Sequence, residues 1–345
     1  MEAMKISKTL FQLYKKIIFL LPPETAHTVS LNIAEFIYGS WLKDYIKSKR
    51  YGSESNIMGI SFPNKLGLAA GFDKNGDYIN FLSNIGFGFI ELGTVTPKPQ
   101  FGNPKPRIFR SIEDEAIINS LGFNNKGIKY LKNNLLKADR NQPIGINIGK
   151  NSNTPIENAY EDYEYCMKEI YNVADYITLN ISSPNTENLR DLHSENYFES
   201  FLKKIKKTHS SLKNLYRKDV PLVIKISPDI SKNNFNHLSN LLINYEIDGI
   251  IATNTTIDRN YINNKGFHLH KGGLSGKPLL IKSNEFISES KKLLKNNIAI
   301  IGTGGITSVE SAEDKIKLGA DLLQMYTGLV YHGQDLVKDI TRFIK

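Results

Sequence analysis

From about residue 54 onward, short apolar runs alternate with longer amphipathic segments. The runs are rich in Ile, Val and Leu, which is typical of strands that are buried on both faces of a parallel sheet. The segments between them, such as 196–215 and 282–295, have apolar residues at helical spacing. The pattern predicts eight strands, at 65–70, 88–95, 144–149, 176–181, 222–227, 249–254, 299–304 and 322–327. Alternating strands and helices of this number favour an α/β fold of the (β/α)8 (TIM) barrel type over a doubly wound sheet.

Two segments do not fit the simple alternation. Residues 55–62 predict a small strand or hairpin that closes the floor of the barrel before its first strand. Residues 97–136 are too long for a plain connection, so we expect a lid or a site-forming insertion there.

The first 48 residues have a different pattern from the rest. No acid occurs between Lys5 and Leu21, where apolar residues recur at helical spacing among lysines, and Pro22–Pro23 ends this helix. A second helix is expected to begin at Glu24 and to run towards Trp41. Short, apolar, lysine-flanked helices are typical of membrane-surface segments. We therefore predict a helix pair at 1–48 that gives access to a membrane, and a barrel at 49–345; the alternative is that the apolar faces pack on the barrel.

Other membrane and targeting signals are weak. No stretch approaches the roughly 20 apolar residues that a membrane-spanning helix needs. A signal peptide is disfavoured because lysines interrupt the apolar segment and no small-residue cleavage site follows.

Polar and small residues gather where the expected strands end. The run that begins at Tyr176 is apolar and then delivers Asn180, Ser182, Ser183 and Asn185. A single such end is often only a turn, but α/β barrels build their active sites from the carboxyl ends of the strands. The same layout recurs at 69–76, 93–94, 147–150, 253–255, 302–306 and 326–328.

Two of these strand ends predict specific chemistry. Lys225 lies inside an apolar strand, where its ammonium needs an anionic or hydrogen-bonding partner. Gly302–Ile306 precedes a helix that we expect to begin near Thr307 or Ser308. Loops after the seventh and eighth strands of barrels hold phosphates with free backbone N–H groups. The combination is compatible with flavin mononucleotide (FMN).

Composition narrows the classes of function. The 345 residues carry 44 Lys and Arg against 35 Asp and Glu, a net charge of +9 that suits an anionic lipid or substrate. No basic stripe is interleaved with aromatic residues, so nucleic-acid binding is disfavoured. The single cysteine, Cys166, excludes an intrachain disulfide and a cysteine-ligated iron–sulfur cluster within the chain. We expect no metal site.

Several motifs, in order along the chain, resemble those of the dihydroorotate dehydrogenase family. They lie at 69–76, 96–104, 119–125, 180–186 and 272–276, and the resemblance extends to 23–27 in the helix pair. The N-terminal extension and a serine at the base position resemble the class 2, membrane-associated and quinone-reducing branch. Cys166 lies in a helical pattern outside the motifs, so it does not replace that serine. Departures from the family pattern are Phe72, Ser120–Leu121 and Thr303.

The resemblance implies a role for each matching position. FMN is expected to contact Ala70, Gly71, Thr94, Asn147, Asn180, Lys225, Thr253, Gly276, Gly305, Tyr326 and Thr327. Dihydroorotate is expected at Lys74, Asn119, Ser120, Leu121, Gly122, Phe123, Asn180, Asn185, Asn254 and Thr255. Ser183 is the expected base, with a proton-relay partner that the sequence does not identify. His27 and Arg110 are expected to hydrogen-bond the quinone, and Glu24 to pair with Arg110.

The resemblance also implies an activity and a location. Dihydroorotate would be oxidised to orotate in pyrimidine synthesis, with a hydride passing to FMN and electrons to a membrane quinone. The protein would sit peripherally on the cytoplasmic face of a bacterial inner membrane. One alternative is a soluble flavin barrel that uses fumarate or a nicotinamide, which the missing base cysteine and cluster ligands disfavour. Another is a non-catalytic membrane-surface protein, which the intact Lys74, Ser183, Asn185 and Lys225 disfavour.

Overall fold

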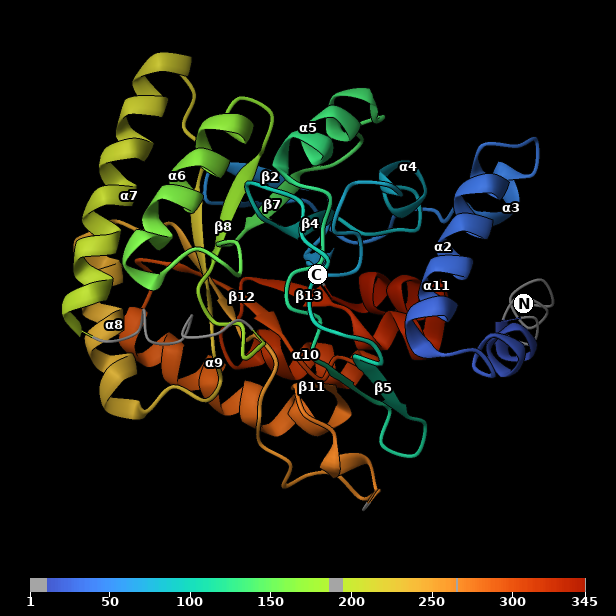
Figure 1. Ribbon diagram of the computed structural model, residues 1–345. Helices are drawn as coiled ribbons and strands as arrows, with labels where there is room; N and C mark the ends of the chain where they lie inside the picture. Colours follow the sequence, from blue (N-terminus) through green and yellow to red (C-terminus); the bar gives the residue numbers. More distant parts are fainter. Residues whose placement is uncertain (1–10, 186–194, 265, 345) are drawn as a thin grey trace.

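A closed barrel of eight parallel strands forms the centre of the computed structural model, which describes residues 11–185, 195–264 and 266–344 (Figure 1). Around the barrel the order is β10-β12-β13-β3-β4-β7-β8-β9. The predicted (β/α)8 fold is confirmed, and each predicted strand is present with its ends shifted by at most a few residues. The strands are β3 Leu66–Leu68, β4 Phe89–Val95, β7 Ile144–Ile148, β8 Tyr176–Asn180, β9 Leu222–Ile226, β10 Gly249–Ala252, β12 Ala299–Thr303 and β13 Leu322–Met325.

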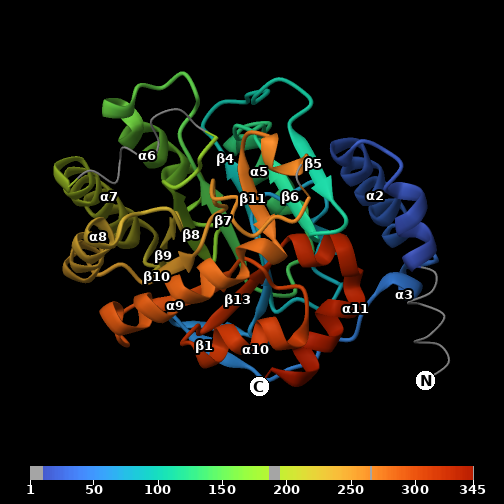
Figure 2. The ribbon, with the colours of Figure 1, turned by 90° about the horizontal axis from the view of Figure 1, so that it is seen from below.

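Amphipathic helices surround the barrel and cover the outer face of its strands (Figure 2). Their apolar stripes pack on strands that are buried along nearly their whole length, which explains why the strand sequences are apolar runs without alternation. The helices are α4 Ile79–Leu82, α5 Ile128–Lys137, α6 Ala159–Ile170, α7 Glu195–Tyr216, α8 Lys232–Asn244, α9 Leu280–Leu294, α10 Val309–Lys317 and α11 Thr327–Phe343.

A short hairpin closes the floor of the barrel, as the sequence predicted. Its strands are β1 Ser55–Ile57 and β2 Ile60–Phe62, paired antiparallel. Phe62 is fully buried and meets Phe89 of β4 edge to face, with ring centroids 5.1 Å apart. Tyr176 of β8 belongs to the same apolar cluster. The hairpin therefore plugs the end of the barrel opposite to the carboxyl ends of the strands.

The long 97–136 segment builds a small sheet over the other end of the barrel. Its strands β5 Ile108–Ser111 and β6 Ala116–Asn119 are joined by β11 Gly273–Gly276, in the order β11-β6-β5. The third strand was not predicted as a strand. Gly273 lets this strand lie close to the loop after β10, because a Cβ there would lie 1.9 Å from Oγ1 of Thr255. The short 3-10 turns η1 Ile156–Asn158, η3 Phe267–Leu269 and η4 Lys277–Leu279 complete the connections.

Two N-terminal helices lie to one side of the barrel, beside α4 and α11 (Figure 1). Residues 11–18 are helical, so the first helix ends before Pro22–Pro23 as predicted, and α2 Pro23–Tyr38 begins one residue before the expected Glu24, with a proline in its first turn. A short α3, Lys43–Ile46, follows. Lys5, Lys8 and Leu10 of the predicted first helix lie outside the described residues. Along the described part of the chain, no helix is both long and apolar enough to cross a bilayer.

Polar contacts attach α2 to the segment around α4. The Tyr78 hydroxyl donates to Asn32 at 2.8 Å, and the Asn84 amide donates to the Tyr38 hydroxyl at 2.9 Å. Much of the remaining apolar surface of the helix pair faces outward: Leu20 is 85% exposed, Trp41 83% and Phe36 78%. The helix pair is therefore fixed to the barrel on one side and presents apolar side chains on the other.

Candidate active site

One cavity of about 280 Å³ runs from the carboxyl ends of the strands to the space between the N-terminal helices. It brings together nearly all the residues that the sequence singled out. Those that line it are His27, Ala70, Gly71, Lys74, Thr94, Arg110, Asn119, Leu121, Gly122, Phe123, Asn180, Ser183, Asn185, Lys225, Thr253, Asn254, Thr255, Gly276, Gly305, Tyr326 and Thr327. Asn147 and Ser120 are not part of the lining.

Asn147 lies beneath the cavity and orients side chains that do line it. Its Oδ1 accepts a hydrogen bond from Thr94 Oγ1 at 2.5 Å, and Thr94 Oγ1 accepts one from Asn180 Nδ2 at 2.9 Å. Asn147 Nδ2 donates to Glu91 at 2.8 Å. Asn147 therefore connects the cavity floor to a buried carboxylate.

Glu91 is a buried residue of this site that the sequence reading missed. It lies in the barrel interior on β4, and besides Asn147 its carboxylate accepts hydrogen bonds from Tyr176, Thr178 and Gln324. The sequence did contain a signal: Glu91 is a charged residue inside the apolar run at 88–95, just as Lys225 is a charged residue inside its own apolar strand. A buried charge of this kind requires partners wherever it occurs in a strand.

Lys225 is nine-tenths buried and faces the cavity. Desolvation lowers the pKa of its ammonium, and the Glu91 carboxylate acts in the opposite direction. Among the described residues its ammonium has no hydrogen-bond partner. A buried cation aimed into a cavity suits a ligand that carries or develops negative charge.

Ser183 lies among the asparagines that the sequence predicted around it. The Asn185 N–H donates to Ser183 Oγ at 3.2 Å, and the Asn185 amide donates to Asn119 Oδ1 at 3.2 Å. The Asn254 amide donates to Ser182 Oγ at 3.0 Å. These side chains offer donors and acceptors on one wall, which fits a small planar ligand with amide and carbonyl edges. Thr186, the last residue of the motif, lies outside the described residues.

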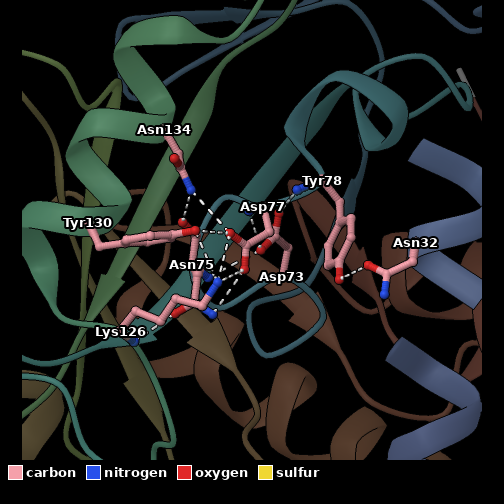
Figure 3. Close-up of polar contacts among 8 residues, drawn as sticks. All are labelled: Asn32, Asp73, Asn75, Asp77, Tyr78, Lys126, Tyr130 and Asn134. Carbon is pink, nitrogen blue, oxygen red and sulfur yellow. Dashed lines mark hydrogen bonds and ion pairs between the residues drawn. The ribbon is translucent and has the colours of Figure 1, made fainter. Parts of the chain in front are cut away.

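Hydrogen bonds of Asp73 and Asp77 hold the loop that carries Lys74 (Figure 3). The Asp73 carboxylate accepts the backbone N–H groups of Asn75, Asp77 and Tyr78, although burial raises its pKa. Asp77 in turn accepts from Lys126, Tyr130 and Asn134.

Lys74 itself is turned towards the cavity. Its ammonium donates to the Gly71 carbonyl at 2.8 Å, and desolvation lowers its pKa to about 8. The ammonium is therefore still largely charged at neutral pH and is available to an anionic ligand.

The loop after β12 has the geometry of a phosphate cradle. Gly304 and Gly305 have φ values of +106° and +77°, and a Cβ on Gly305 would come within 2.4 Å of Leu280 Cα. Ser308 caps α10 and forms a capping box with Ser311, as the sequence led us to expect for the start of this helix. Backbone N–H groups of such a loop and the positive end of the helix attract a phosphate. Together with Lys225, the residues present therefore fit the phosphate and ring of FMN.

His27 occupies the far end of the cavity. Its Nε2 lies 2.8 Å from the Phe72 carbonyl, and since a carbonyl only accepts, Nε2 carries the proton. Desolvation and the nearby Lys74 charge lower its pKa to about 4, so the ring is neutral and Nδ1 has a free lone pair.

Arg110 lies at the same end of the cavity and is anchored to the first helix segment. Its Nη2 donates to the Phe19 and Leu21 carbonyls at 3.0 and 2.8 Å, and its guanidinium lies 4.2 Å from the Phe19 ring centroid. The expected pairing of Glu24 with Arg110 is wrong. Glu24 binds Arg107 instead, with distances of 2.7 and 3.2 Å, while Arg110 is directed to the Phe19 and Leu21 carbonyls.

Comparisons with known proteins point to one family. The sequence model of the family "Dihydroorotate dehydrogenase" matches residues 53–345. A relative from Buchnera aphidicola subsp. Schizaphis graminum, named "Dihydroorotate dehydrogenase (quinone)", is 53% identical over 96% of this chain and 99% of its own length. A protein of the same name from Haemophilus influenzae (strain PittEE) is 47% identical over 97% of this chain and 100% of its own.

A solved structure shows the same architecture. Dihydroorotate dehydrogenase from Eimeria tenella, crystallised with ferulenol, superposes with a TM-score of 0.83 at 34% identity and covers 92% of this chain and 89% of its own. The sequence match spans the whole barrel, and the relatives align over nearly their full length. The chain belongs to the dihydroorotate dehydrogenase family.

Proposed function

We propose that this protein oxidises dihydroorotate to orotate in pyrimidine synthesis, with FMN as cofactor and a membrane quinone as electron acceptor. The observation that carries the proposal is the cavity described above, which joins the wall around Ser183, the cradle at Gly305 and the His27–Arg110 end. Substrate, flavin and quinone can thus be held in one continuous space. The names of the bacterial relatives support the same reaction.

The chain's own residues would hold FMN along the barrel mouth. The residues assigned to it are Ala70, Gly71, Thr94, Asn147, Asn180, Lys225, Thr253, Gly276, Gly305, Tyr326 and Thr327, with Asn147 acting from beneath. When bound, FMN supplies a two-electron acceptor that can be reoxidised by a quinone. Lys225 stabilises negative charge on the ligand because its ammonium is buried and faces the cavity.

Dihydroorotate would lie against the asparagine wall. Lys74 binds its carboxylate, and Asn119, Asn185 and Asn254 hydrogen-bond its ring amides and carbonyls. Ser183 Oγ would take the proton from C5 and the hydride from C6 would pass to bound FMN, leaving the C5–C6 double bond of orotate. Ser183 is buried, and this desolvation favours transfer of the proton to a positioned oxygen over loss to bulk water.

The quinone end divides donor and acceptor roles between two residues. Nε and Nη1 of Arg110 have no hydrogen-bond partner among the described residues, so they can donate to a quinone carbonyl. The Nε2 proton of His27 is engaged by Phe72, which leaves its Nδ1 lone pair to accept from a quinol hydroxyl. Arg110 can therefore donate to the oxidised quinone, and His27 can accept from the reduced quinol.

Peripheral attachment to a membrane would deliver the quinone. The exposed Leu20, Phe36 and Trp41 lie on the helix pair that borders the cavity, and an apolar face of this kind binds a membrane interface. We place this attachment on the cytoplasmic face of a bacterial inner membrane, in line with the bacterial relatives.

Anaerobic stopped-flow absorbance of the flavin-loaded protein tests the proposal. Dihydroorotate should bleach the flavin, and a soluble quinone should restore its colour. Ser183→Ala should keep the flavin but bleach orders of magnitude more slowly at neutral pH, whereas Ser152→Ala, on an exposed loop, should behave as wild type. No bleaching of the loaded wild type would refute the substrate. Recovery with fumarate or a nicotinamide but not with quinone would refute the acceptor.

A further inference from the structure

Lys315 on α10 is fully buried, and it lies outside the cavity. Its ammonium donates to Ser283 Oγ at 2.7 Å and to Asn284 Oδ1 at 2.9 Å, both near the start of α9. It forms no ion pair with any described residue. Burying an ammonium without an anion costs free energy. We therefore expect Lys315 either to have a nearby negative charge or to be partly deprotonated.

Two hydrogen bonds connect Lys315 to the phosphate cradle. Ser283 Oγ accepts a hydrogen bond from Lys315 and donates one to the Thr303 carbonyl at 2.6 Å. Thr303 ends β12 and is followed directly by Gly304 and Gly305. The cradle also rests on α9, because a Cβ on Gly304 would lie 3.2 Å from Ser283 Cβ. The views in Figures 1 and 2 show α9 and α10 side by side on this flank of the barrel.

We propose that Lys315 is a positioning residue for the flavin phosphate: through Ser283 it fixes the Thr303–Gly305 loop, and its ammonium is the buried counter-charge of the phosphate dianion. The inference rests on the proposed FMN site and assigns a role to a residue that does not touch the ligand. The peptide of Thr303 is polarised by the Ser283 hydroxyl at its carbonyl, which strengthens the N–H groups that follow as donors to an anion.

The electrostatic surroundings of Lys315 predict that the affinity for FMN depends on pH. Desolvation lowers its pKa to about 7, and its neighbour Asp314 acts in the opposite direction. Asp314 is the one charged group among the described residues that acts on it; α9 presents the neutral Ser283 and Asn284, and β12 the Thr303 carbonyl. A bound phosphate dianion favours the charged ammonium, so loading of the flavin should raise this pKa. Reciprocally, FMN should bind more tightly below pH 7 than above it.

Flavin release on dilution of the flavin-loaded full-length protein gives the test, with the fluorescence of released flavin as readout. Lys315→Met removes the charge but keeps the length of the side chain. At about pH 6.5 the variant should release flavin more readily than wild type. The ratio of their Kd values should then shrink by up to roughly 25-fold by about pH 8.5, if one group with a pKa of about 7 controls it. Lys74 also titrates in this range, but it is present in both proteins and cancels in the ratio.

Matched variants separate positioning from packing. Lys317→Met makes the same change two residues later on α10, where the side chain is exposed and paired with Glu313, and should match wild type. Lys315→Arg should restore tight binding with less pH dependence, since a guanidinium stays charged. Ser283→Ala, which removes only the bridging hydroxyl, should weaken flavin binding and decides the matter if Lys315→Met does not fold.

The outcomes distinguish this inference from the function it rests on. A Kd ratio that is independent of pH, or a Lys315→Met protein that holds flavin as wild type does, would overturn the role of Lys315 alone. A wild-type protein that binds no FMN would instead overturn the proposed cofactor.

Discussion

Replacing Glu91 with glutamine tests whether the barrel interior depends on its buried carboxylate. The two oxygens of Glu91 accept four hydrogen bonds, one from Asn147 at Oε1 and three at Oε2 from Tyr176, Thr178 and Gln324. A glutamine amide keeps one accepting oxygen and puts a donor in the other position. Whichever way the amide is turned, an N–H group then faces another donor.

The cost follows from those contacts. If the amide oxygen replaces Oε2, the three donors there keep a neutral partner, and each bond loses about 1 kcal/mol because it is no longer charge-assisted. The Asn147 amide is left buried without an acceptor, which costs about a further 1–3 kcal/mol. It cannot flip to compensate, since its Oδ1 already accepts from Thr94. The lower cost of burying a neutral side chain offsets part of the sum, so we expect a loss of about 3–5 kcal/mol.

Urea unfolding followed by circular dichroism would measure this loss on the flavin-loaded proteins. Glu157→Gln, the same exchange at an exposed position, is the matched control and should stay within about 0.5 kcal/mol of wild type. A loss below about 1 kcal/mol for Glu91→Gln, with an unchanged slope against urea, would show that the network is not needed in its charged form. The carboxylate would then serve to favour the charged form of Lys225 and not to stabilise the fold.

Two further changes probe the cavity itself. Gly305→Ala should abolish flavin retention, because the new Cβ would meet Leu280 at 2.4 Å and φ is +77°; the visible absorbance per protein measures it. Gly59→Ala, with a similar φ of +72° but open space, should keep its flavin, and equal retention in both variants would contradict the cradle. Raising the pH through 8 should raise KM for dihydroorotate by up to about tenfold per pH unit, since Lys74 then loses its charge. A Lys74→Met protein that showed the same rise would rule out this lysine as its source.

The barrel was predictable because its strands and helices have different hydrophobic periods. Each strand is covered by helices outside and by packed side chains inside, so every residue of a run such as Gly249–Ala252 is buried and apolar. The polar strand ends were predictable for the complementary reason, since parallel strands bring their carboxyl ends to the same edge. Ser183, Lys225 and Gly305 meet in one cavity although more than a hundred residues separate the first from the last.

Other features depend on partners that are distant in the sequence. Gly273–Gly276 forms β11 only because β6 lies beside it; two glycines in four residues give no strand pattern of their own. The partner of Glu24 depends on where each arginine side chain points in the folded chain. The sequence positions of Arg107 and Arg110 did not reveal this. Ser182 was visible at a strand end, but its contact with Asn254 follows from the barrel, in which β8 and β10 lie on either side of β9.

Some buried charged residues can be recognised from the sequence and others cannot. Lys225 and Glu91 both interrupt apolar strands, and one physical argument applies to both, so Glu91 was within reach of sequence reasoning. Lys315 gives no such signal: on an amphipathic helix a lysine is normally on the solvent face, and only its contacts with α9 show that it is buried. The two buried lysines approach the proposed flavin from different directions, Lys225 directly from the barrel and Lys315 from behind the loop. The carboxylate of Glu91 lies beneath, where it favours the charged form of Lys225. An anionic ligand is thus expected to stabilise the charged state of residues that the fold alone holds at a cost, which is why we expect cofactor affinity and pH to be coupled.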